Sequence, residues 1–139
     1  LLSRGLGDVY KRQARDWLLG FLRERVPSNL GQPLASLPRF QEIVGRIDTL
    51  LFANRNLLDS AAIGLVEPKN AGQLKQLVTQ NAIQAVELAI QATGNPGLSR
   101  HNPLERHYRD VLCSRIHTPQ DDVVFHGTGR TALNEESAP

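Results

Sequence analysis

The residues best suited to metal or nucleophilic chemistry are four histidines and one cysteine. His101, His107, His117 and His126 are separated by 6, 10 and 9 residues, and Cys113 stands alone among them. A structural zinc site needs closely paired ligands, such as a CxxC motif or two histidines one helical turn apart. Because no such pair occurs, we expect no metal site, and a single cysteine excludes an intramolecular disulfide.

His117 stands at a predicted joint between two helices. Thr118 is a good N-cap, Pro119 suits the first helical turn, and Asp121 follows three residues after the cap. The helix N-terminus after His117 carries partial positive charge, which suits chemistry in which negative charge develops. In most proteins a histidine at such a joint is a cap or a solvated surface group, so its role depends on the surrounding motif.

Helical periodicity predicts the elements that position this joint. Apolar residues recur three and four apart from Phe40 to Leu65, which predicts a long amphipathic helix ending near Gly64. A further helix is predicted from about Ala71 to Thr93, and it has two apolar stripes, so it should lie centrally in a bundle. Its stripes are Leu74, Leu77, Val78, Ala85, Leu88, Ala89 and Ala92, and Ile83, Val86 and Ile90.

The remaining segments complete a helical fold. The stretch from Ala14 to Leu22 is typical of the end of a helix, and residues 26–38, with three prolines, form a connector. Asn102 and Pro103 begin another helix, and the last helix runs to about Leu133. No strand pattern is visible. The predicted class is all-α, an antiparallel four-helix bundle with a short final helix.

The first thirteen residues, LLSRGLGDVYKRQ, have neither a helical nor a strand period, and back-translated DNA for Ser3–Gln13 resembles a transposase-based sequencing adapter. We therefore expect a non-native segment at 1–13, a bundle domain at 14–133 and a disordered tail at 134–139. Residues 1–13 hold three of the 16 basic and one of the 14 acidic residues, which leaves 13 of each. We therefore expect no nucleic-acid partner, because these charges balance. No apolar run is long enough to span a bilayer, so we expect no membrane association. The lone cysteine favours a cytoplasmic location.

The run from Gln91 to His117 resembles the C-terminal signature of the acyl-CoA dehydrogenase superfamily. That signature reads QxxGGxGF, a proline before a hydrophobic-Glu-basic triplet, RD and IYEGT. Here QATGNPGL, PLER, RD and IHTPQ follow in the same order without a gap. Arg25, Gly31 and Leu34 echo the family's RxxFGxxL connector with two extra residues. The resemblance implies the C-terminal domain of a larger flavoenzyme, which forms one wall of the flavin pocket and the core of a homotetramer.

The resemblance also implies which residues meet the cofactor. Gln91, Gly94 and Gly97 would contact the adenosine-diphosphate portion of the flavin, although they are equally typical of a helix that stops at a glycine. The other cofactor-binding residues implied are Arg25, Thr118 and Gln120, and His117 is the implied catalytic residue.

Departures from the family pattern leave the chemistry open. Thr118 replaces the glutamate that abstracts the substrate α-proton in a large branch of the family, and threonine is no base near neutral pH. His117 resembles the histidine of the flavin-dependent monooxygenase branch, so we favour monooxygenase chemistry, with FAD or reduced FMN and a small-molecule substrate. One alternative is a true acyl-CoA dehydrogenase with its base elsewhere, where Glu42, Asp48 and Asp59 are the acids of the long helix. A second alternative is a non-catalytic helical interaction module.

Overall fold

The computed structural model describes residues 2–94, 109 and 121–135, and its regular elements are all helices. The long helices are α1 (Leu2–Glu24), α2 (Pro38–Ala62) and α3 (Ala71–Thr93), and α5 covers Asp121–Asn134. Short 3-10 helices, η1 (Leu34–Ser36) and η2 (Pro68–Asn70), precede α2 and α3. The all-α prediction is confirmed, and α3 has the bounds predicted for it. The helix predicted after Asn102 lies outside the described residues.

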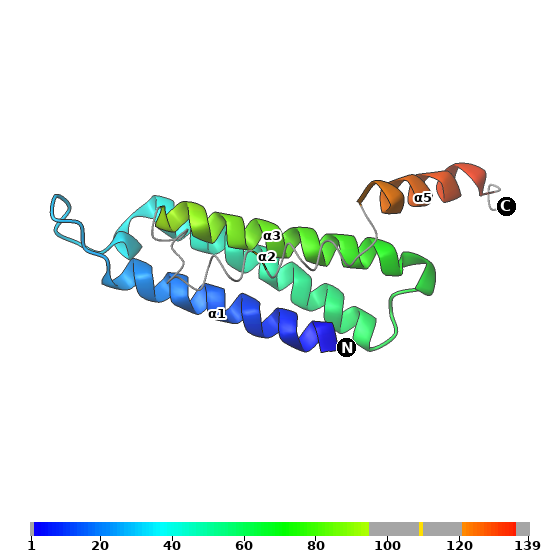
Figure 1. Ribbon diagram of the computed structural model, residues 1–139, viewed down its shortest axis with the longest axis horizontal. Coiled ribbons are helices and arrows are strands. Elements are labelled where there is room, and N and C mark those ends of the chain that lie inside the picture. The colour runs from blue at the N-terminus through cyan, green and yellow to red at the C-terminus, as the bar shows by residue number, and fades with distance from the viewer. Residues whose placement is uncertain (1, 95–108, 110–120, 136–139) are drawn as a thin grey trace.

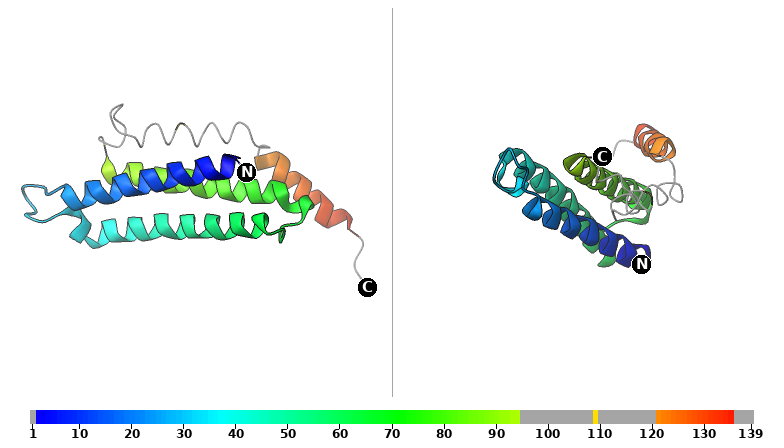
Figure 2. Two further views of the ribbon diagram at one scale, coloured as in Figure 1. Left: turned by 90° about the horizontal axis from the view of Figure 1, so that it is seen from below. Right: turned by 60° about the vertical axis from the view of Figure 1, so that its left-hand side comes forward.

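α1, α2 and α3 lie side by side, each antiparallel to the one before it (Figure 1). The end of α1, the start of α2 and the end of α3 therefore meet at one end of the bundle, which we call the connector end. α5 begins beside the opposite, N-terminal end of α3 and extends past it (Figure 2). Because α3 contacts α1, α2 and α5, its predicted central position is confirmed.

The first helix is longer than its sequence suggested. Residues 1–13 were expected to lack a helical period, yet α1 begins at Leu2 and runs through Ala14 without interruption. Starting a helix is the costly step, whereas each added residue contributes one hydrogen bond. The segment before Ala14 contains no proline, so a helix held in place by its core residues can extend backwards through it.

The main core lies between the three long helices, on the side of the connector end. α1 contributes Leu18 and Leu22, which are 1% and 2% exposed, and α2 contributes Phe40 and Ile47. α3 meets them with small side chains, and Trp17 packs against the same core while stacking on Phe21, with ring centroids 5.3 Å apart. The alanines at this seam are Ala85, Ala89 and Ala92, joined on α1 by Ala14.

The second stripe of α3 is buried at Ile83 and Val86, as predicted for a helix packed on more than one side. Two residues of the predicted apolar stripes are exposed. Leu65 is 71% exposed because α2 ends at Ala62, before the stripe reaches it, and Leu77 is 46% exposed on the outward side of α3.

The core predicts a steep difference between two identical substitutions. Leu18→Ala should lower the free energy of unfolding by about 3 kcal/mol, because it removes a buried side chain and leaves a cavity. Leu133→Ala makes the same change in α5 at a side chain that is 88% exposed, and it should cost less than about 0.5 kcal/mol. Urea denaturation followed by circular dichroism measures both, and equal losses would contradict this core.

Candidate functional site

The last turn of α3 carries two of the residues predicted to bind a cofactor. Gly94 caps α3 with φ +64° and ψ −137°, and its N–H donates to the carbonyl of Ile90 at 3.0 Å. Residues with a Cβ rarely adopt this backbone conformation, which explains why a glycine ends the helix here. Gln91, one turn earlier, has an exposed side chain. The helix-stop interpretation of Gly94 is thus confirmed, and Gln91 presents an amide beside it.

The connector that resembles RxxFGxxL is a closed loop at the same end of the bundle. The N–H of Leu34 donates to the carbonyl of Arg25 at 3.0 Å, which holds the two ends of the loop together. Gly31, with φ +67°, makes the turn, and its N–H donates to the carbonyl of Pro27. Leu34 packs against the core, whereas the Arg25 side chain is exposed. Arg25, Gln91 and Gly94 therefore all lie at the connector end (Figure 1).

An open groove of about 820 Å³ runs between the outward faces of α2 and α3 and reaches Gln91. Most of its lining residues are polar or charged, and Leu50 and Leu88 are the large apolar ones. The other lining residues are Glu42, Gly45, Arg46, Thr49, Gln84, Glu87 and Gln91. No histidine, cysteine or serine is among these described lining residues, so the groove offers hydrogen bonds and charge but no nucleophile with its base.

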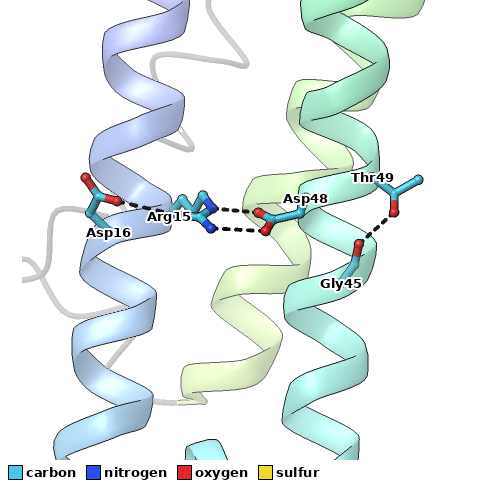
Figure 3. A network of polar contacts seen from close by, with 5 residues as sticks. All are labelled: Arg15, Asp16, Gly45, Asp48 and Thr49. Carbon is cyan, nitrogen blue, oxygen red and sulfur yellow. Dashed lines mark hydrogen bonds and ion pairs between the residues drawn. The ribbon is translucent and has the colours of Figure 1, made fainter.

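The three acidic residues of α2 differ in their partners and in their position along the helix. Asp48 accepts two hydrogen bonds from Arg15 of α1, at 2.6 Å from Nε and 3.0 Å from Nη2, as Figure 3 shows. Glu42 pairs with Arg46 one turn along α2, at 2.9 Å. Asp59 lies in the last turn of α2, near the end of the bundle opposite Gln91. Asp48 and Glu42 are thus held by arginines, and a carboxylate held in this way is a poor candidate for a general base.

The ion pair between α1 and α2 changes the titration of Arg15. Hydrogen bonding to Asp48 raises the pKa of the Arg15 guanidinium, while burial opposes the change. A raised arginine pKa contributes stability below the unfolded-state pKa, and this contribution is lost only as the pH rises through the folded-state pKa. That window is strongly alkaline, so titration of Arg15 gives no pH dependence near neutrality.

Several predicted site residues lie outside the described part of the chain, namely Gly97, His117, Thr118 and Gln120. Among residues 2–94, 109 and 121–135, no group of three histidine, cysteine, aspartate or glutamate side chains is placed to bind a metal. Within the same residues, no helix combines the length and apolar character needed to cross a bilayer.

Sequence reasoning missed polar contacts that join the long helices. Arg15 and Asp48 are 33 residues apart, and Asn54 and Asn81, which share a hydrogen bond, are 27 apart. Neither pair follows a local spacing rule. The one sequence feature that could have indicated the second contact is Asn54 itself, a polar residue seven positions after Ile47 in a line of otherwise apolar residues.

Two glycines at opposite ends of α3 should respond oppositely to alanine. Gly94→Ala should lower the free energy of unfolding by about 1 kcal/mol, because a residue with a Cβ is strained at the positive φ of this position. Gly72→Ala should be neutral or stabilising by up to about 1 kcal/mol, because its Cβ would lie 3.7 Å from Val124 in ordinary contact and alanine favours helices. Thermal unfolding of both variants measures the difference, and a loss at Gly72 larger than at Gly94 would contradict it.

The Arg15–Asp48 pair should contribute modestly. In a double-mutant cycle with alanine at both positions, we expect a coupling of about 0.5–1 kcal/mol, because the side chains are 34% and 43% exposed and water screens them. The exposed Glu42–Arg46 pair is the control, with an expected coupling of no more than about 0.5 kcal/mol. Urea titrations in low and high salt measure both couplings. An undiminished coupling at high salt would show that Arg15 and Asp48 are shielded from solvent.

With this geometry in place, comparisons with known proteins identify the chain's relatives. The family described as "Acyl-CoA dehydrogenase, C-terminal domain" matches residues 12–124. YdbM of Bacillus subtilis, named provisionally as an acyl-CoA dehydrogenase, is 32% identical over 120 residues, which are 81% of this chain and 32% of YdbM. The 3-sulfinopropanoyl-CoA desulfinase of Advenella mimigardefordensis is 34% identical over 101 residues, covering 70% of this chain and 25% of the desulfinase.

A solved structure shows the same fold. Butyryl-CoA dehydrogenase from Megasphaera elsdenii superposes with a TM-score of 0.79 and 23% identity, over 90% of this chain and 33% of that one. The chain thus spans a third or less of the length of these relatives. Because the family match extends over most of its residues and the helices share that fold, the chain belongs to the acyl-CoA dehydrogenase family, as its C-terminal domain.

Proposed function

We propose that this domain belongs to a flavin-dependent acyl-CoA dehydrogenase that oxidises the Cα–Cβ bond of an acyl thioester. The observation that carries the proposal is the family match over residues 12–124, supported by curated relatives whose names refer to CoA compounds. These relatives favour the dehydrogenase alternative over the monooxygenase chemistry that His117 suggested. FAD is the cofactor that the family implies, and it would accept the hydride.

The connector end fits the diphosphate portion of FAD. A Cβ built at Gly94 would meet no atom of the described residues within 4 Å. Gln91 offers an exposed amide one turn away, and the exposed Arg25 guanidinium makes no ion pair with a described residue. An amide and a cation at the same end of the bundle as a glycine turn suit an anionic, hydrogen-bonding ligand. We propose that Arg25, Gln91 and Gly94 bind this group together with Gly97, Thr118 and Gln120.

The base that removes the substrate α-proton is proposed to lie outside this domain. Thr118 occupies the position where one branch of the family has its glutamate, and threonine does not serve as a base near neutral pH. Asp48 and Glu42 are both engaged by arginines. In this proposal the domain binds and orients the flavin, and His117 supports flavin binding without removing the proton.

The domain is also proposed to form the core of a homotetramer. Its outward surface along α2 and α3 exposes large apolar side chains, with Phe52 70%, Ile63 73% and Leu77 46% exposed. Exposed apolar residues of this size on neighbouring helices are typical of a surface that is covered in an assembly. The full-length enzyme should then have the mass of four chains by light scattering, and a monomer would contradict this assembly.

The function is tested in the full-length enzyme, whose gene is recovered by reading the genomic frame upstream of the codon for Ala14. That frame also tests the proposal that residues 1–13 are not native. The purified enzyme should carry FAD and reduce an artificial electron acceptor when an acyl-CoA is added. An oxygen-dependent hydroperoxyflavin intermediate without acyl-CoA turnover would support the monooxygenase instead. Absence of both flavin and turnover would support the interaction module.

Gln91→Ala should weaken flavin binding by about tenfold, because it removes one hydrogen bond to an anionic ligand, worth about 1.4 kcal/mol. Titration of the deflavinated full-length enzyme with FAD measures the dissociation constant. Gln84→Ala is the matched control, since Gln84 is also exposed and lies two turns earlier on α3. Equal effects of the two substitutions, or none, would remove Gln91 from the flavin site.

A further inference from the structure

A buried amide interrupts the apolar contact between α2 and α3. The buried residues of α2 are Phe40, Ile47 and Asn54, spaced seven apart, so the third lies in line with two apolar residues. Asn54 is only 2% exposed. Burying an amide is strongly unfavourable unless its donor and acceptor are both paired.

Both ends of the Asn54 side chain are paired with α3. Its Nδ2 donates to the main-chain carbonyl of Val78 at 2.9 Å, and its Oδ1 accepts from Nδ2 of Asn81 at 3.0 Å. A main-chain carbonyl occurs at every residue of a helix, so the first bond could form again after α2 slid along α3. The second bond is specific, because it needs an asparagine at one position.

The apolar seam of α3 does not by itself select a position for α2. The alanines that α3 contributes to the main core, Ala85, Ala89 and Ala92, recur every three or four residues. If α2 slid by one turn, about 5.4 Å, its apolar residues would meet alanine again. Asn54 would then face Leu77 or Ala85 in place of Asn81, and its acceptor would lose its donor.

We propose that the Asn54–Asn81 pair selects one register of α2 against α3 from those that the alanine seam accepts. A single buried asparagine is known to fix register in coiled coils, at some cost in stability. In this domain the selected register brings Gln91 to the same groove as Glu42 and Arg46. The proposal is independent of flavin binding and of the reaction.

The test measures the register directly in the 139-residue chain. Spin labels are attached to Glu42→Cys and Lys75→Cys, two exposed positions near the N-termini of α2 and α3, with Cys113→Ser removing the native thiol. Labelled chain is diluted in unlabelled chain, so that only distances within one molecule are measured by double electron–electron resonance. The parent should give one narrow distance distribution.

Asn54→Leu with Asn81→Leu should keep the helical circular dichroism but add a second distance, displaced by about one turn, or about 5.4 Å. Asn54→Ala with Asn81→Ala should do the same without overfilling the interface. Ile47→Leu, in the same buried line one heptad earlier, is the control and should keep the single distance. A single unshifted distance in both double variants would overturn the proposal. Loss of helicity in both would also overturn it, because the pair would then be needed for folding itself.

Discussion

Alanine side chains on α3 let α1 and α2 approach its backbone closely, and the rest of the domain depends on this contact. Leu18 and Leu22 from α1 and Phe40 from α2 form one core cluster with Ala85 and Ala89. Burial of these side chains is the main favourable term in folding. It also holds the end of α3 beside the connector, so Gln91 and Gly94 have a rigid support although both are exposed.

Polar contacts align the helices that this packing holds together. The Arg15–Asp48 pair spans α1 and α2 at the edge of the core, where both side chains remain partly in water. A pair of this kind contributes little net stability, yet its two parallel hydrogen bonds require a defined geometry. The Asn54 amide does the same between α2 and α3, deeper in the interface. The energy of the bundle thus comes mainly from apolar burial, and its alignment from a few polar groups.

Periodicity and capping signals were enough to predict the class, the central helix and its bounds. Ala71–Thr93 could be read correctly because a proline-containing turn precedes it and Gly94 ends it. The start of α1 was missed because a helix held by tertiary contacts extends through residues that have no apolar period of their own. Leu77 was placed in the core wrongly, since spacing defines a stripe but not how wide the covered face is.

The candidate site could be predicted only in part. Gly94 predicted the end of a helix because glycine readily adopts a positive φ, which is a local property of the residue. The arginine partner of Asp48 lies 33 residues away, and only the packing of α1 on α2 brings it there. The roles of His117, Gly97, Thr118 and Gln120 stay predictions that rest on the resemblance of the motif.

The stacked pair Trp17–Phe21 has a practical consequence for following the assembly of this bundle. Trp17 is the only tryptophan in the chain, and it packs against the core from α1 alone. Its fluorescence therefore reports whether α1 has packed against α2 and α3. The contact between α2 and α3 contains no tryptophan and does not contribute to this signal. Comparing tryptophan emission with far-ultraviolet circular dichroism would separate docking of the first helix from formation of the α2–α3 hairpin, without adding any label.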